Sequence, residues 1–363
     1  MLKKHLKPIH IITAQLTVLL LLLLSLANQY YPALSQSIDS AADLGSDHTT
    51  EETEDDYIKW VDFGVTYEAM DNTYQYDVDT YGQEVHLDWI ELLACLGAKY
   101  GGDFSLYQEK DLTALAKALI SQEETIESLT EDMHYYSYYL KAYTAVLGGL
   151  VGSYEIQIDD ENNPGELVWV EKYGLKGFSP IAKGFEYQHY EDFGTSRSYG
   201  YKRLHLGHDM MGQVGTPIIA VESGYVEAMG WNQYGGWRLG IRSFDGKRYY
   251  YYAHLRKNFP YHTELETGSI VSAGDVIGFM GRTGYSTTEN TNNIEVSHLH
   301  FGLQLIFDES QKEGTNEIWI DCYELTKFLS KNKSATLKHE ETKNYYRVYG
   351  LIDPAVADYL QSQ

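Results

Sequence analysis

Three short histidine-containing motifs in the second half of the chain carry the side chains best suited to chemistry. They are His205-Leu206-Gly207-His208-Asp209, Tyr252-Ala253-His254-Leu255 and Ser297-His298-Leu299-His300-Phe301. Histidine nitrogens and a carboxylate oxygen are typical donors to catalytic zinc, which usually takes three protein ligands and one water. The motifs therefore predict a zinc site of the hydrolytic kind, in which further histidines serve as acid–base groups.

The last motif has the spacing of a strand that lines a cavity. Side chains two positions apart share one face of a strand, so His298 and His300 point the same way while Leu299 and Phe301 point into the core. His254 is expected at the end of a tyrosine-rich strand, in phase with the alternate tyrosines before it. The pattern directs the two imidazoles of the last motif into one cavity.

Short strands are expected to position these motifs. From about residue 153 the apolar pattern has a period of two, which is typical of strands. Candidate strands cover residues 154–158, 167–170, 218–221, 225–228, 239–244 and 247–255. An Asn-Pro-Gly turn separates the first two, and Asp245-Gly246 separates the last two, which is a strong hairpin signal. We expect a mostly antiparallel β domain.

Taken together, the stretch from about residue 179 to 305 resembles the lysostaphin-type (LytM-like) zinc metallopeptidases, which cleave peptide cross-links in peptidoglycan. The resemblance covers about a third of the chain. The matching pieces are His205/Gly207/Asp209, Gly215-Thr216-Pro217-Ile218, Ala220 with Gly224 and Val226, Tyr252-Ala253-His254-Leu255, residues 278–284, and His298-Leu299-His300-Phe301. It implies the duplicated-hybrid-motif fold of that family.

The resemblance also implies residue roles. One Zn²⁺ would be bound by His205, Asp209 and His300, and His254 and His298 would be the two non-ligating active-site histidines. We assign His298 as the base that takes a proton from water, because histidine titrates near working pH. His254 is assigned as the hydrogen-bond donor to the developing oxyanion, and the two roles could be shared or exchanged.

Other histidines and one loop depart from the family pattern. His208 occupies a variable position, which leaves a ligand or supporting role open but not favoured, and His189 and His262 fall outside the pattern. The 13 residues of 285–297, between Gly284 and His298, form a longer connection than the family often needs. We expect this loop to reshape or gate the substrate groove.

The N-terminus indicates export. Lys3, Lys4 and Lys7 precede the uncharged apolar residues 9–27, a length near that of a bilayer span. Ser25-Leu26-Ala27 could also be a signal-peptidase site, so an anchor and a cleaved signal both remain open. In either case the rest of the chain is expected on the extracytoplasmic face of a bacterial membrane, or secreted.

Charge and cysteine content fit this location. Beyond residue 28 the chain has 25 basic and 52 acidic residues, a net charge of −27. Such a surface argues against nucleic-acid partners. With Cys95 and Cys322 alone, the chain does not rely on disulfides. Cys95 lies in an apolar run and is expected to be a buried free thiol.

The fold class expected is α+β multidomain, with a mostly antiparallel β catalytic domain preceded by a helical domain and an N-terminal transmembrane or signal helix. A helix is predicted over 88–100 with Asp88 as N-cap, and a second from an N-cap at Asp111, continuing as far as residue 133. The expected parts are residues 1–28 as anchor or signal, 29–56 as an acidic disordered stalk, 57–152 as a helical domain, 153–178 as a β-hairpin connector, 179–310 as the metallopeptidase domain and 311–363 as a C-terminal helical extension.

The sequence thus predicts an exported, membrane-anchored zinc endopeptidase acting on peptidoglycan stem peptides or cross-bridges. The alternative is a latent or non-catalytic scaffold of the same fold, with residues 57–152 docking an envelope protein. Retention of all five active-site residues favours the enzyme. No readable code in the specificity loops identifies the bond that is cut.

Overall fold

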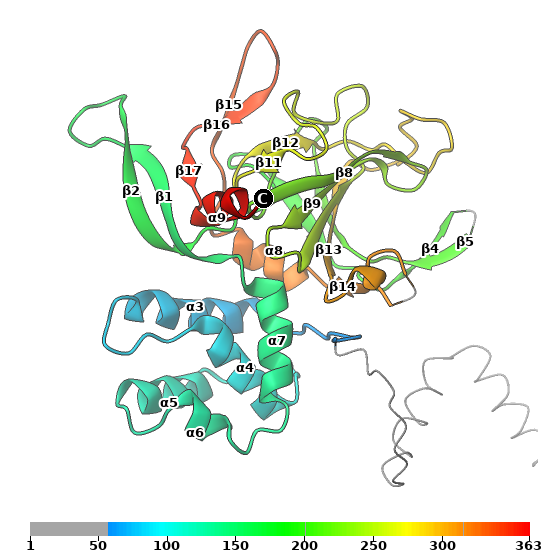
Figure 1. The fold of residues 1–363 in the computed structure, drawn as a ribbon. Coiled ribbons are helices and arrows are strands. Elements are labelled where there is room, and N and C mark those ends of the chain that lie inside the picture. Colours follow the sequence, from blue (N-terminus) through cyan, green and yellow to red (C-terminus); the bar gives the residue numbers. More distant parts are fainter. Residues whose placement is uncertain (1–56, 200, 315) are drawn as a thin grey trace, which may run out of the picture. The chain divides into compact units, whose positions relative to one another are not determined.

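One antiparallel sheet organises the computed structural model, which describes residues 57–199, 201–314 and 316–363 (Figure 1). Its strands follow the order β11-β8-β9-β10-β13-β6-β3, and β14 pairs with β13. The bounds are β3 Tyr187–Tyr190, β6 His208–Gly212, β8 Gly224–Asn232, β9 Gly236–Ser243, β10 Arg248–Ala253, β11 Ile270–Val271, β13 His298–Leu305 and β14 Ile318–Ile320. The expected antiparallel β domain is confirmed.

The central strand β13 brings distant motifs side by side. Its His300 is paired with Ala253 of β10 on one side and with Asp209 of β6 on the other. Directly paired residues of an antiparallel sheet share a face. His298, also on that face, is opposite Met211. The strand register therefore places the histidines of the third motif next to Asp209 of the first motif.

Smaller sheets surround this one. The predicted hairpin is present as β1 Val151–Asp159 and β2 Leu167–Leu175, and β17 Leu351–Ile352 extends it to three strands. Three two-stranded sheets pair β12 with β7, β15 with β16 and β4 with β5. Their bounds are β4 Ser196–Tyr199, β5 Tyr201–Leu204, β7 Pro217–Ile219, β12 Val276–Phe279, β15 Thr336–Lys338 and β16 Tyr345–Arg347.

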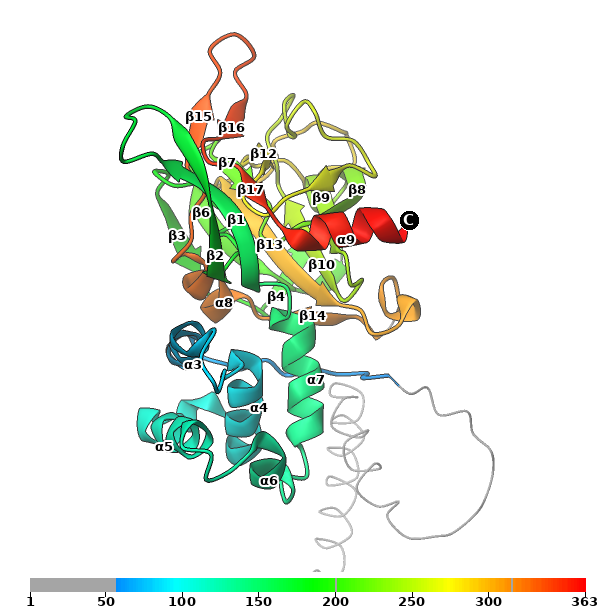
Figure 2. The ribbon, with the colours of Figure 1, turned by 60° about the vertical axis from the view of Figure 1, so that its left-hand side comes forward.

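The segment before β1 is helical, as expected (Figure 2). It contains α3 Tyr67–Thr80, α4 Trp89–Tyr100, η1 Phe104–Leu106, α5 Glu109–Ile120, α6 Ile126–Thr130 and α7 Tyr136–Leu147. Asp88 caps α4 as predicted, accepting hydrogen bonds from the amides of Ile90 and Glu91. The predicted cap at Asp111 was wrong: it lies in the first turn of α5, where its carboxylate binds Tyr100 and Lys99. That helix also ends at Ile120 instead of continuing to 133.

The segment 311–363 is not simply helical. It holds the short η2 Glu309–Gln311 at its start, α8 Tyr323–Leu329 and α9 Pro354–Ser362, but also β14 to β17. The prediction of a helical extension was therefore wrong in part. Ile318 and Ile320 are buried while Trp319 is half-buried, which is the alternation of a strand packed on one face.

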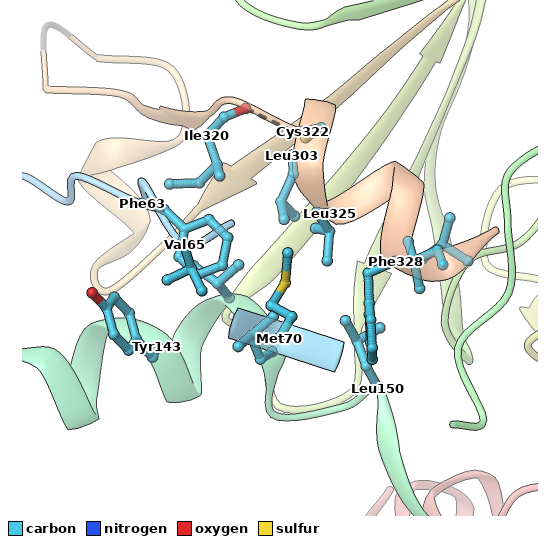
Figure 3. Packing of buried hydrophobic residues seen from close by; sticks show 14 of the residues in the cluster. Phe63, Val65, Met70, Tyr143, Leu150, Leu303, Ile320, Cys322, Leu325 and Phe328 are labelled. Atoms are coloured by element: carbon cyan, nitrogen blue, oxygen red, sulfur yellow. Dashed lines mark hydrogen bonds between the residues drawn. The ribbon is translucent and has the colours of Figure 1, made fainter. Parts of the chain in front are cut away.

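Buried side chains from the helices and the sheet meet in one apolar cluster (Figure 3). Met70 of α3 and Tyr143 of α7 belong to it together with Leu303 of β13, Ile320 of β14 and Phe328 of α8. A buried ion pair adds to this junction: Arg248 of β10 binds Glu222 at 2.7 Å and donates to the carbonyl of Ala145 in α7 at 2.9 Å. Residues 57–363 accordingly form one compact unit.

The predicted anchor or signal at 1–28 and the stalk at 29–56 lie outside the described residues. Among the helices that the structure does describe, none is long and apolar enough to span a bilayer. Cys95 and Cys322 are both buried and free, as expected for Cys95.

Candidate metal centre and active site

Three side chains predicted as zinc ligands converge at one edge of β13. His205 follows β5, Asp209 lies in β6 and His300 lies in β13, and one ligand atom from each falls within 4.8 Å of the others. Nε2 of His205 is 2.9 Å from Nδ1 of His300, and Oδ1 of Asp209 is 3.1 and 3.0 Å from these nitrogens. Two imidazole nitrogens and one carboxylate oxygen form a donor set suited to zinc.

The electrostatics of this cluster favour the protonation states that bind a cation. Burial opposes ionisation of Asp209, but hydrogen bonds from His205 and His300 hold the pKa of its carboxyl well below the usual range. Burial lowers the pKa of His300, which favours the neutral ring. Burial also acts to lower the pKa of His205, yet the hydrogen bond and charge of Asp209 raise it overall. A cation would compete with that proton for the same nitrogen.

The two remaining histidines stand beside the cluster with defined tautomers. The ring centroids of His254 and His298 are 4.8 Å apart, and that of His254 is 5.7 Å from His300. Nδ1 of His254 lies 2.9 Å from the carbonyl of Thr283, and Nδ1 of His298 lies 2.8 Å from the carbonyl of Val296. Because a carbonyl only accepts, each Nδ1 must donate its proton, which leaves the lone pair of Nε2 open on both rings.

His254 does not continue its strand, contrary to the predicted phase. Strand β10 ends at Ala253, and His254 follows with a φ of 61° in the left-handed region. Its amide donates to the carbonyl of Gly235 at 2.8 Å. This turn, rather than strand alternation, places the His254 ring beside His298.

Two residues near the ligands were missed by the sequence motifs. Asp192 is 8% exposed, and its Oδ1 lies 2.9 Å from Nδ1 of His205. Arg197 of β4 contacts the other oxygen of Asp192 and lies 3.4 Å from Oδ2 of Asp209. A carboxylate behind a ligating histidine fixes its ring orientation and raises its basicity. Asp192 precedes His205 by 13 residues and belongs to no motif, so only the pairing of β3 with β6 reveals it.

Residues 203–313 match the model of peptidase family M23. This part of the chain is a peptidase family M23 domain. Over 124 residues the chain is 36% identical to the L-Ala–D-Glu endopeptidase of Bacillus subtilis. The aligned stretch covers 34% of this chain and 36% of that protein. It is 37% identical over 99 residues to lysostaphin from Staphylococcus staphylolyticus, 27% of this chain and 18% of that protein. The chain thus spans about a third or less of these relatives.

A solved structure of lytM from Ruminococcus gnavus is similar over a longer stretch. It covers 77% of this chain and 92% of its own, with a TM-score of 0.50 and 22% identity. At that identity the likeness concerns the fold. Because it reaches well beyond the M23 domain, part of the flanking structure shares that fold too.

The other histidines stand apart from the ligand cluster of the M23 domain. His208 points to the opposite face of β6 from Asp209, where its Nε2 lies 2.7 Å from Nδ1 of His189 beside the ring of Tyr323. Burial, followed by the charge of His189, lowers the pKa of His208 to about 3. His262 packs its ring on Tyr346, 4.8 Å between centroids. As predicted, these three are not part of the cluster.

A groove of about 830 Å³ opens over the ligand cluster of His205, Asp209 and His300. Arg203 of β5 lies between the rings of Tyr234 and Tyr285, at 5.0 and 5.2 Å from their centroids. The 285–297 loop contributes Tyr285 and residues 294–296 to the lining. Asn290 holds this loop in place, because its Oδ1 accepts from Nε1 of Trp237 at 2.9 Å. The loop therefore forms a wall of the groove, as its length suggested.

Proposed function

We propose that this protein is an exported zinc-dependent endopeptidase that hydrolyses peptide bonds in peptidoglycan stems or cross-links. One observation carries the proposal: a three-ligand cluster and two histidines with open Nε2 atoms face the same groove. The relatives named as an L-Ala–D-Glu endopeptidase and as lysostaphin support the substrate class.

The metal would be held by His205, Asp209 and His300. Their donor atoms and spacing fit one zinc ion, and Asp192 behind His205 supplies the supporting carboxylate that such sites usually have. When bound there, zinc lowers the pKa of water towards neutrality and polarises a carbonyl. The remaining chemistry falls to the protein's own histidines.

His298 is the base in this proposal. Its Nε2 has an open lone pair, and Oδ2 of Asp209 at 3.7 Å would stabilise the imidazolium that forms when a proton is taken. Burial and the neighbouring charges of His298 and His300 hold the pKa of His254 well below its usual value. A neutral His254 with its proton on Nδ1 can accept from water at Nε2, but it donates to an oxyanion only after gaining a proton. We therefore infer that His298 takes the proton of the attacking water, while the neutral His254 accepts a hydrogen bond from that water at Nε2.

The N-terminal sequence supports export, with residues 9–27 serving as anchor or cleaved signal. The catalytic unit then faces the cell wall.

The test uses the purified full chain incubated with peptidoglycan, with zinc measured by elemental analysis and released fragments identified by mass spectrometry. We expect stoichiometric zinc and new peptide termini. His300→Ala should lose both zinc and cleavage, because it removes a ligand. His298→Ala should keep zinc and lose cleavage by about 100-fold or more, the scale of a missing general base.

His262→Ala serves as the matched control, since His262 lies outside the cluster and should retain zinc and activity. Full zinc occupancy of the wild type without cleavage of any peptidoglycan would contradict the enzyme and favour the scaffold alternative. Equal zinc in wild type and His300→Ala would contradict the ligand assignment.

A further inference from the structure

The groove continues from the ligand cluster along one face of the sheet. Tyr251 of β10 is paired with Gly302 of β13 and Gly240 of β9, neither of which has a side chain to fill that face. The ring of Tyr251 lies 5.9 Å from that of His300 and 6.2 Å from that of Trp319. An unbroken floor thus runs from the cluster to Trp319 of β14.

Arg238 of β9 lines this floor next to Tyr251 and Tyr249. It is two positions from Gly240, so its side chain lies on the same face. Burial raises the pKa of both phenols, and the positive charge of Arg238 opposes that rise in each. Arg238, Tyr249 and Tyr251 thus line the same groove.

The guanidinium of Arg238 is incompletely satisfied. Within the described residues its Nη1 is buried and has no hydrogen-bond partner. Among the nearby carboxylates, Glu317 accepts from Nε1 of Trp319 at 2.7 Å and one oxygen of Glu227 binds Lys312. The other oxygen of Glu227 is buried without a hydrogen-bond partner in the described part of the chain, and Glu313 also lines the groove. A buried donor left unpaired destabilises the protein, and more so when it is charged.

We propose that Arg238 is a specificity residue that binds a free carboxylate of the substrate peptide. The inference rests on the proposed endopeptidase function and narrows its substrate class. A guanidinium presents parallel N–H donors that match the two oxygens of a carboxylate. The adjacent hydroxyl groups of Tyr249 and Tyr251 offer further donors to the same anion.

Tyr251, which lines the groove together with Arg238, sets the scale of distance from the ligand cluster. An extended peptide rises about 3.3 Å per residue, so the 5.9 Å between the rings of His300 and Tyr251 corresponds to about two residues. The recognised group is therefore a carboxylate within a few residues of the reacting centre. A chain of glycines offers none there, whereas a stem peptide with an unamidated acidic residue does.

Isothermal titration calorimetry on the full, zinc-loaded chain tests this inference. The probes are the tetrapeptide L-Ala-γ-D-Glu-L-Lys-D-Ala and two analogues, one with the α-carboxylate of D-Glu amidated and one with the C-terminus amidated. We expect one of the two amidated analogues to bind the wild type about 10- to 100-fold more weakly than the unmodified tetrapeptide does, the scale of a charge-assisted hydrogen bond. The Arg238→Gln variant should bind that analogue and the unmodified tetrapeptide with equal affinity.

Arg256→Gln is the control, because it removes the same charge from an exposed residue outside the groove lining and should keep the preference. Arg238→Lys should recover part of the preference through its charge. Equal binding of all three peptides by the wild type, or an unchanged preference in Arg238→Gln, would overturn the inference. Carboxylate-dependent binding without peptidoglycan hydrolysis would instead contradict the proposed function and leave the carboxylate site standing.

Discussion

At the scale of single residues, Asp192 gives the clearest prediction, because it would act on a bound metal only through His205. Asp192→Asn removes the negative charge 2.9 Å from Nδ1 of His205 and leaves the main-chain carbonyl of residue 192, which lies 3.3 Å from the same nitrogen. We expect zinc affinity to fall by about 10- to 100-fold, as for other carboxylates that orient a ligating histidine. Competition with a zinc-binding dye measures the dissociation constant directly.

The control for this prediction is Asp358→Asn, an exposed carboxylate of α9 far in sequence from the ligands. It should leave zinc affinity unchanged. If Asp192→Asn also binds zinc as the wild type does, then Asp192 serves only to hold Arg197 and β4.

The ligand residues could be predicted from sequence, but their surroundings could not. His205, Asp209 and His300 lie in short motifs whose spacing is set by local geometry, so the pattern identifies them. Asp192 and Arg238 carry no such signal, because each lies outside the motifs and reaches its place only in the folded chain. The protonation of His254 was likewise beyond sequence reasoning, because it depends on the carbonyl of Thr283.

At the scale of elements, the 285–297 loop gives a prediction about substrate binding. Oδ1 of Asn290 accepts from Nε1 of Trp237 and from the amide of Asn258, at 2.9 and 2.8 Å. Asn290→Ala removes both bonds and also places alanine at a φ of 59°, which asparagine tolerates better. We expect KM for peptidoglycan peptides to rise about 3- to 10-fold, since each hydrogen bond contributes about 0.5–1.5 kcal/mol.

Steady-state kinetics on a soluble stem peptide would separate the effect of Asn290 on KM from any effect on kcat. Thr288→Ala, an exposed change in the same loop, should leave both unchanged. A fall in kcat with KM unaltered would show that the loop orients the catalytic histidines instead of forming the groove wall.

The elements themselves were predictable where local signals are strong. Asp88 followed by an apolar helical pattern located α4, and Asp245-Gly246 located the turn between β9 and β10. Strand β14 was missed because its three residues stand in a segment with helical neighbours. Its strand conformation comes from pairing with β13, a contact that no local pattern encodes.

At the scale of the whole molecule, the M23 domain does not stand apart from its neighbours. Arg248 ties β10 to the end of α7, and Met70 and Tyr143 of the helices share a core with Leu303 beneath the ligand strand (Figure 3). Movement of the helical segment would therefore reach β13, which carries His298 and His300. If the alternative of a latent protein holds, this connection is the physical route by which a partner docked on residues 57–152 would act on the site.

The same shared core predicts that the chain cannot be shortened to residue 310, three residues before the end of the family match. Ending it at residue 310 removes β14 and α8, and with them Ile318, Ile320, Leu325 and Phe328, each at most 5% exposed. Burial of such side chains contributes about 1.5–3 kcal/mol each, and four together approach the about 5–15 kcal/mol that stabilises a typical protein. We expect the 1–310 chain to lose cooperative thermal unfolding and near-ultraviolet circular dichroism, and with them zinc binding.

A chain ending at residue 353 lacks only α9, which has no buried residue, and should keep all three properties. Cooperative unfolding and zinc binding by the 1–310 chain would instead show that the M23 domain folds without this support.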